Sequence, residues 1–201
     1  MIEFSLIQGD DRLIVLPGEE SEIKAVCERT GASVLAIRNL DWNRDLSPWP
    51  ADKVFRKGED FTGQGADTLH AIEEWLNRNG SGYRTVIIAG YSLAGLFALY
   101  AAAESSCFER CVSASGSLWF PGFQQWLKEH PVRCHTVYLS LGDQEKNARN
   151  PLMASVETET YGIFETLRTY TDCEMKMNPG NHFNDPEGRL CAGIESVFRR
   201  L

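Results

Sequence analysis

Short apolar runs alternate with stretches of helical character along the chain. The runs at 12–16, 33–37, 85–89, 111–114, 136–141 and 174–177 predict six strands, and residues 2–7 offer an additional one. Helices are predicted over 20–29, 66–79, 93–104, 122–129, 152–170 and 186–200, and a long loop over 39–64. This alternation predicts an α/β fold in one domain, 1–201: a mostly parallel sheet of about six to seven strands with helices on both faces.

The segment around residue 92 has the layout of a nucleophile turn. Residues 85–89 (TVIIA) are uniformly apolar, as expected for a strand buried on both faces. Gly90-Tyr91-Ser92-Leu93-Ala94 follows, and then an alanine- and leucine-rich helix. A strand, a sharp turn flanked by small residues and a helix expose a serine hydroxyl at the positive end of the helix dipole. We therefore predict that Ser92 is a catalytic nucleophile; the alternative is an ordinary N-cap.

A nucleophilic serine of this kind needs an acid and a histidine, in that order along the chain. Of the four histidines, only His182 follows the acid candidates at a strand end, which makes it the predicted general base. The turn after the strand at 136–141 carries Asp143 and Glu145. Either carboxylate can accept a hydrogen bond from the histidine and stabilise its charged form.

The remaining parts of such a site are predicted from strand ends. The oxyanion hole is expected to use the backbone N–H of Leu93 and a second N–H from Gly18 or Glu19, after the strand at 12–16. Aromatic residues at or beyond strand ends can wall an acyl or aryl pocket, although each can equally pack a loop against the sheet. The pocket candidates are Trp42, Trp49 and Trp119.

The composition limits the classes of binding partner and cofactor that we expect. The 201 residues carry a net charge of −8 without basic clusters, so we expect neither nucleic acid nor an anionic membrane surface as a partner. No apolar run is long enough to span a bilayer, and the N-terminus lacks the pattern of a signal peptide, so a cytoplasmic location is predicted. The six cysteines are scattered, which speaks against a metal site or a disulfide framework; no cofactor is expected.

Several segments of the chain together carry a resemblance to a known family. They are 41–50 (DWNRDLSPWP), 90–95 (GYSLAG), 113–119 (SASGSLW), 140–145 (SLGDQE) and 180–182 (GNH). These segments resemble the esterases of the α/β-hydrolase superfamily that include esterase D-like enzymes, feruloyl esterases and siderophore esterases. The resemblance implies an α/β-hydrolase fold, here truncated at its N-terminal edge, and it points to Glu145 as the acid. Ala94 stands where the family more often has glycine.

Together these features predict a serine hydrolase, specifically a carboxylesterase that cleaves small-molecule esters or thioesters through a Ser-His-acid triad and an acyl-enzyme intermediate. Two other functions are open at this point. One is a non-catalytic binding protein with the same fold, and the other is an acyltransferase that passes the acyl group to an acceptor other than water. Nothing in the sequence indicates the oligomeric state.

Overall fold

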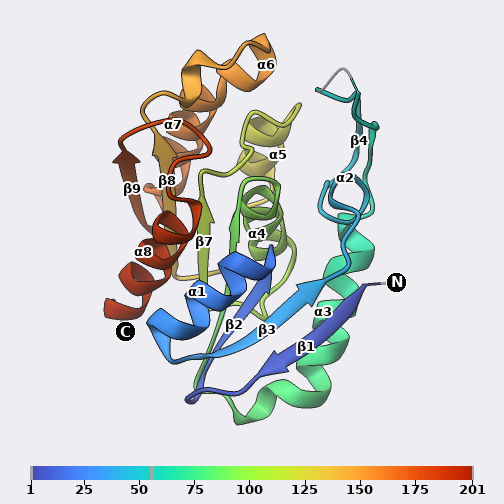
Figure 1. Ribbon diagram of the computed structural model, residues 1–201, viewed down its shortest axis with the longest axis vertical. Coiled ribbons are helices and arrows are strands. Elements are labelled where there is room, and N and C mark those ends of the chain that lie inside the picture. The colour runs from blue at the N-terminus through green and yellow to red at the C-terminus, as the bar shows by residue number, and fades with distance from the viewer. Residues whose placement is uncertain (1, 55–56, 201) are drawn as a thin grey trace.

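The computed structural model describes residues 2–54 and 57–200. Seven strands form one sheet in the order β1-β3-β2-β6-β7-β8-β9 (Figure 1). Only β1 runs antiparallel to its neighbour, pairing Phe4 with Ile37; the other pairs are parallel. The strands are β1 (Glu3–Ile7), β2 (Arg12–Pro17), β3 (Ser33–Arg38), β6 (Thr85–Tyr91), β7 (Arg110–Ala114), β8 (Thr136–Gly142) and β9 (Asp172–Asn178).

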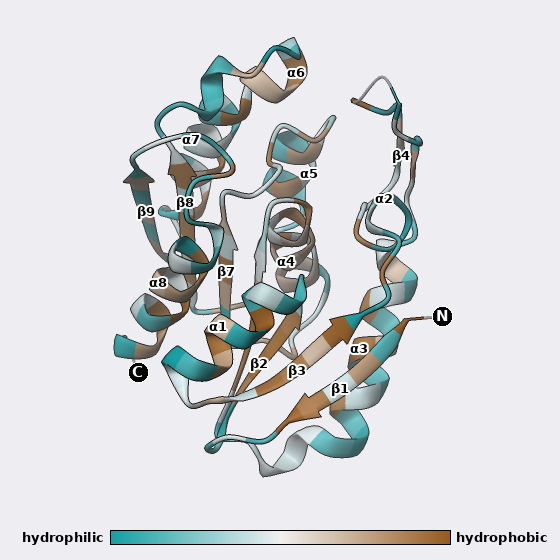
Figure 2. Cartoon of the chain, in the orientation of Figure 1, coloured by the Kyte–Doolittle hydropathy of each residue, from teal (hydrophilic) through white to brown (hydrophobic). Residues whose placement is uncertain are grey.

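Helices cover both faces of this sheet, so that hydrophobic residues gather along the strands and on the helix sides that meet them (Figure 2). On one face, α1 (Glu20–Thr30) and α8 (Pro186–Arg199) bury Ile23, Val26 and Ile194. The other face carries α3 (Gly65–Asn79), α4 (Leu93–Glu104), α5 (Phe123–Glu129) and α7 (Val156–Leu167). Residues 93–103 of α4 are apolar on every side of the helix, which fits the burial of all eleven of them.

The predicted α/β class, the six strands, the additional N-terminal strand and the helices on both faces are confirmed. At the N-terminal edge, β1 is the last strand among the described residues. No helix in this part of the chain is long and apolar enough to cross a membrane.

Two predictions of local structure were wrong. The expected loop over 39–64 contains a helical turn, α2 (Trp42–Asp45), and a small hairpin of β4 (Pro50–Ala51) and β5 (Phe61–Thr62); its residues 55 and 56 lie outside the described residues. The single helix expected over 152–170 is divided into α6 (Pro151–Ala154) and α7. At the division, the Ser155 hydroxyl donates to the carbonyl of Leu152 at 2.7 Å, and the Ser155 N–H bonds the same carbonyl. These local bonds compete with the regular helical pattern.

Candidate active site

Ser92 occupies the tight turn between β6 and α4. Its backbone has φ 57° and ψ −123°, a conformation that costs free energy in a non-glycine residue and is typical of functional turns. The turn is held by three N–H groups that donate to the Ser92 carbonyl, from Gly95, Leu96 and Ser117, at 2.9–3.1 Å. Gly90 is required here because a Cβ atom at this position would collide with the backbone carbonyl of Ala94.

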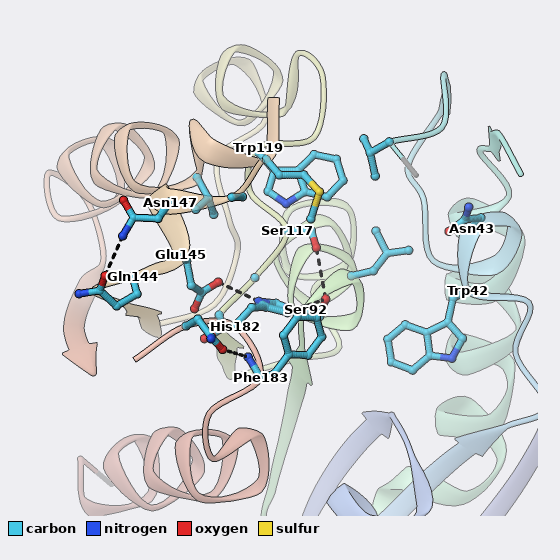
Figure 3. Close-up of a pocket in the computed structure, with 18 of the residues that line it drawn as sticks. Trp42, Asn43, Ser92, Ser117, Trp119, Gln144, Glu145, Asn147, His182 and Phe183 are labelled. Carbon is cyan, nitrogen blue, oxygen red and sulfur yellow. Dashed lines mark hydrogen bonds and ion pairs between the residues drawn. The ribbon is translucent and has the colours of Figure 1, made fainter. Parts of the chain in front are cut away.

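His182 connects Ser92 to Glu145 by two hydrogen bonds (Figure 3). The histidine Nε2 lies 2.9 Å from Ser92 Oγ, and its Nδ1 lies 2.8 Å from Glu145 Oε2. His182 follows β9, and Glu145 begins the 3-10 turn η2 (Glu145–Asn147) after β8. Parallel strands bring their carboxyl ends to one edge, so residues 90 positions apart meet there.

Asp143, the other acid candidate, has a different partner. Its Oδ1 accepts a hydrogen bond from the Gly180 N–H at 2.8 Å, and its own N–H donates to the Asn178 carbonyl. Asp143 thus fastens the loop that carries His182, whereas Glu145 contacts the imidazole itself. The geometry therefore distinguishes the two carboxylates that the residues alone left open.

A cavity of about 650 Å³ opens beside Ser92 and His182. Two of the three predicted tryptophans, Trp42 and Trp119, line it. Phe183, which the sequence interpretation did not single out, also lines the cavity although 84% of its surface is exposed. The wall also has apolar residues, which are Val54, Phe61, Leu93, Ala148, Met153 and Val156.

Trp49 lies away from this cavity, which corrects its assignment as a pocket residue. Its ring centroid lies 5.7, 6.2 and 5.6 Å from those of Phe120, Phe123 and Trp126. Its indole N–H donates to the Pro121 carbonyl at 3.0 Å. Trp49 therefore packs the loop before β4 against α5, where both its apolar ring and its one donor are satisfied.

Of the two expected sources of oxyanion-hole donors, only one lies at the cavity. Leu93 lines the cavity, and its N–H at the start of α4 makes no hydrogen bond within the described residues. Gly18 and Glu19 follow β2, next to β6, but neither lines the cavity. The Glu19 N–H instead donates to the carboxylate of Glu22 at 2.8 Å, as part of a capping box at the start of α1. Burial raises the pKa of the Glu22 carboxyl.

The sequence interpretation gave no role to several polar groups behind or beside this site. The Ser117 hydroxyl lies 3.4 Å from Ser92 Oγ. The Tyr91 hydroxyl donates to the His182 carbonyl at 2.6 Å, and burial raises the pKa of that phenol. Arg189 of α8 reaches Glu145 from within the protein. Tyr91 and Ser117 fall inside the segments that carry the family resemblance, but no local pattern marks Arg189.

Other chemistry is scarce in the described part of the chain. No cluster of three or more histidine, cysteine, aspartate or glutamate side chains is arranged to hold a metal ion there. The six cysteines are free thiols. Burial raises the pKa of Cys134 and of Cys173 to about 12, which keeps these thiols protonated.

The whole chain superposes on solved structures of hydrolases. Siderophore hydrolase EstB from Aspergillus nidulans matches with a TM-score of 0.71 at 15% identity, over 98% of this chain and 88% of that chain. The fold is therefore decided. This chain is an α/β-hydrolase in fold. Siderophore hydrolase EstA from the same organism matches this chain with a TM-score of 0.69 at 16% identity, over 96% of this chain and 84% of that one.

A third neighbour is Est1E from Butyrivibrio proteoclasticus, solved with ferulic acid bound. It matches with a TM-score of 0.62 at 15% identity, over 99% of this chain and 94% of that chain. The structural neighbours of this chain thus include siderophore hydrolases and a protein that binds ferulic acid. No protein-family model and no curated protein matches the sequence.

Proposed function

We propose that this α/β-hydrolase is a serine carboxylesterase with Ser92 as nucleophile, His182 as general base and Glu145 as the acid. The observation that carries the proposal is the unbroken chain of hydrogen bonds from Ser92 Oγ through His182 to Glu145, at 2.9 and 2.8 Å. Both distances are within the reach needed for direct proton transfer and for orienting the imidazole. The siderophore hydrolases among the structural neighbours agree with this proposal.

The reaction proceeds in two balanced halves. Ser92 Oγ attacks the ester carbonyl carbon while its proton moves to His182 Nε2, and Glu145 stabilises the resulting imidazolium. When the tetrahedral intermediate collapses, the bond to the leaving oxygen breaks and His182 gives the proton to the departing alcohol, or to the thiol of a thioester. Water then attacks the acyl group on Ser92 with the same base, which releases the carboxylic acid and restores the hydroxyl.

The developing oxyanion needs donors that are already in position. We assign one to the Leu93 N–H, whose place at the start of α4 adds the helix dipole. The turn formed by Gly18 and Glu19 follows β2, directly beside β6, but neither residue lines the cavity and the Glu19 N–H is bonded to Glu22, so this structure supports only the Leu93 donor.

The substrate that fits is a small molecule with an apolar acyl or aryl group. Trp42, Trp119 and Phe61 present ring surface to the cavity, and a volume of about 650 Å³ is in the range of sites for small ligands. Ester and thioester substrates remain equivalent for this site. We further propose a cytoplasmic location, with which the six free thiols agree.

Hydrolysis of p-nitrophenyl esters tests the proposal. We expect turnover of p-nitrophenyl butyrate by the wild type and its loss in Ser92→Ala. Ser155→Ala serves as a control, because this serine lies between α6 and α7 and does not line the cavity. A folded wild type that turns over neither short-chain nor aryl esters would favour the non-catalytic binding protein. Transfer of the acyl group to an added alcohol in preference to water would favour the acyltransferase.

A further inference from the structure

Arg189 is a buried arginine placed behind the proposed triad. Only 3% of its surface is exposed, although arginine is rarely buried unless its charge is paired. It extends from α8 toward the carboxyl edge of the sheet. Its Nη1 lies 3.3 Å from Glu145 Oε1 and 3.1 Å from Ser115 Oγ, and its Nη2 donates to the Pro179 carbonyl at 2.9 Å.

The two oxygens of Glu145 are therefore held by different groups. Oε2 faces His182, whereas Oε1 accepts hydrogen bonds from the Gly142 N–H at 2.7 Å and from Arg189. These partners fix the rotation of a carboxylate whose side chain is only 4% exposed. They also place a positive charge beside the buried negative one, which otherwise would be costly.

Arg189 also reaches the histidine loop and the nucleophile turn. Pro179, whose carbonyl it binds, lies three residues before His182. The Tyr91 hydroxyl, 3.4 Å from Nη1, belongs to the residue before Ser92 and donates to the His182 carbonyl. One guanidinium therefore contacts the acid, the histidine loop, the nucleophile turn and the β7 loop at Ser115, a use of its planar set of donors that lysine cannot reproduce.

We infer that Arg189 is a positioning residue of the hydrolase site, which locks Glu145 and the His182 loop and neutralises the acid's charge. The inference rests on the proposed function. With Arg189 present, the neutral imidazole and the ion pair give a centre of no net charge; without it, the same centre carries one negative charge.

The inference predicts the direction of a change in pH dependence. Three titratable groups from three elements surround the imidazole: Glu145 from η2, Tyr91 from β6 and Arg189 from α8 by way of Glu145. Asp143 reaches the same loop at Gly180, and Asp185 caps α8. Once Arg189 is replaced by a neutral side chain, the unpaired charge of Glu145 favours an extra proton on the Glu145–His182 pair. A higher pH is then needed to remove that proton and leave the carboxylate beside a neutral imidazole.

The test is the pH dependence of Ser92 labelling by an alkyl fluorophosphonate, followed by mass spectrometry, since this needs no knowledge of the substrate. We expect Arg189→Met to shift the midpoint of the acid limb upward by about one pH unit, the lower end of what a neighbouring charge produces. Arg189→Lys retains the charge but not the four contacts, so it should label more slowly with a midpoint close to that of the wild type. An unchanged midpoint in Arg189→Met, or an equal shift in both variants, would overturn the inference.

Two controls separate the possible failures. If folded wild type is not labelled at Ser92, the proposed function fails; if it is labelled but the midpoint ignores Arg189, only the present inference fails. Should Arg189→Met not fold, the paired variant Glu145→Gln/Arg189→Met decides, because it buries no unmatched charge. If the paired variant folds and Arg189→Met does not, the result supports charge pairing between Arg189 and Glu145. If neither variant folds, Arg189 is needed for packing, and the inference is overturned.

Discussion

Replacing Glu145 by glutamine tests the proposed role of this residue as the acid, because it exchanges one carboxylate oxygen for an NH₂ group. The structure determines how the new amide must lie. The oxygen has to occupy the Oε1 position, because the Gly142 N–H at 2.7 Å and Arg189 at 3.3 Å both donate there. The amide N–H₂ then faces Nδ1 of His182, 2.8 Å away in the wild type. Two donors cannot face each other, so Nδ1 must give up its proton and accept.

The consequence is a histidine in the wrong tautomer. With its proton on Nε2, the imidazole cannot accept the proton of Ser92. A loss on the order of 10⁴ in kcat is known for an amide that fixes the wrong tautomer in a serine protease triad, and it corresponds to about 5 kcal/mol of activation free energy. We therefore expect Glu145→Gln to lose 10³-fold or more of kcat with p-nitrophenyl butyrate, on the order set by that precedent.

Asp143→Asn provides the matched control two residues away. Asparagine keeps an oxygen that can accept from the Gly180 N–H, the bond that Asp143 makes at 2.8 Å. Its loss of kcat should stay below about tenfold, the scale of one weakened hydrogen bond. Circular dichroism and thermal melting show that both variants are folded. If Asp143→Asn lost as much activity as Glu145→Gln, the assignment of the acid would be refuted.

Three further predictions concern the turn, the cavity mouth and the thiols. Gly90→Ala should lower the free energy of unfolding by about 1–3 kcal/mol or more, because the new Cβ collides with the Ala94 carbonyl. Thermal or urea melts measure this loss. The control is Gly82→Ala at an exposed position, which has open space around the new Cβ and should not destabilise the protein. Equal melting temperatures in the two variants would contradict the steric argument. Phe183→Ser should change stability by less than about 0.5 kcal/mol because the ring is exposed, but should raise KM several-fold for an aryl ester; an unchanged KM would remove Phe183 from the binding surface. At pH 8, Cys134 and Cys173 should react with iodoacetamide far more slowly in native than in unfolded protein, because a pKa of about 12 leaves few thiolates; rapid native alkylation would show that these thiols are accessible as thiolates.

Local patterns predicted most of the fold, and they singled out three residues that the structure brings together: Ser92, His182 and Glu145. The strand, turn and helix around Ser92 are contiguous in the chain, so the order of apolar and small residues in this one segment predicts all three. His182 could be found from its order after Ser92 and its place at a strand end. Predictions failed where the outcome depends on partners distant in sequence. Trp49 packs on residues more than 70 positions away, and nothing near it distinguishes such packing from lining a cavity.

Arg189 illustrates the same limit more sharply. On the helix at 186–199 it looks like any charged residue among apolar ones, and its contacts lie from 10 to 98 residues away. The division between α6 and α7 at Ser155 is a different case, because it depends on a local bond of the serine hydroxyl to the Leu152 carbonyl. Serine also occurs inside unbroken helices, so its presence in the sequence did not predict the division. The hairpin of β4 and β5 was missed because each strand has only two residues.

The most direct test of the central claim is to identify the residue that becomes covalently modified. Folded protein is treated with an alkyl fluorophosphonate and digested, and the modified peptide is sequenced by mass spectrometry. The account predicts one adduct, on Ser92, that is absent from Ser92→Ala and formed far more slowly by His182→Ala. An adduct on another residue, or an unmodified Ser92 in folded wild type, would contradict it.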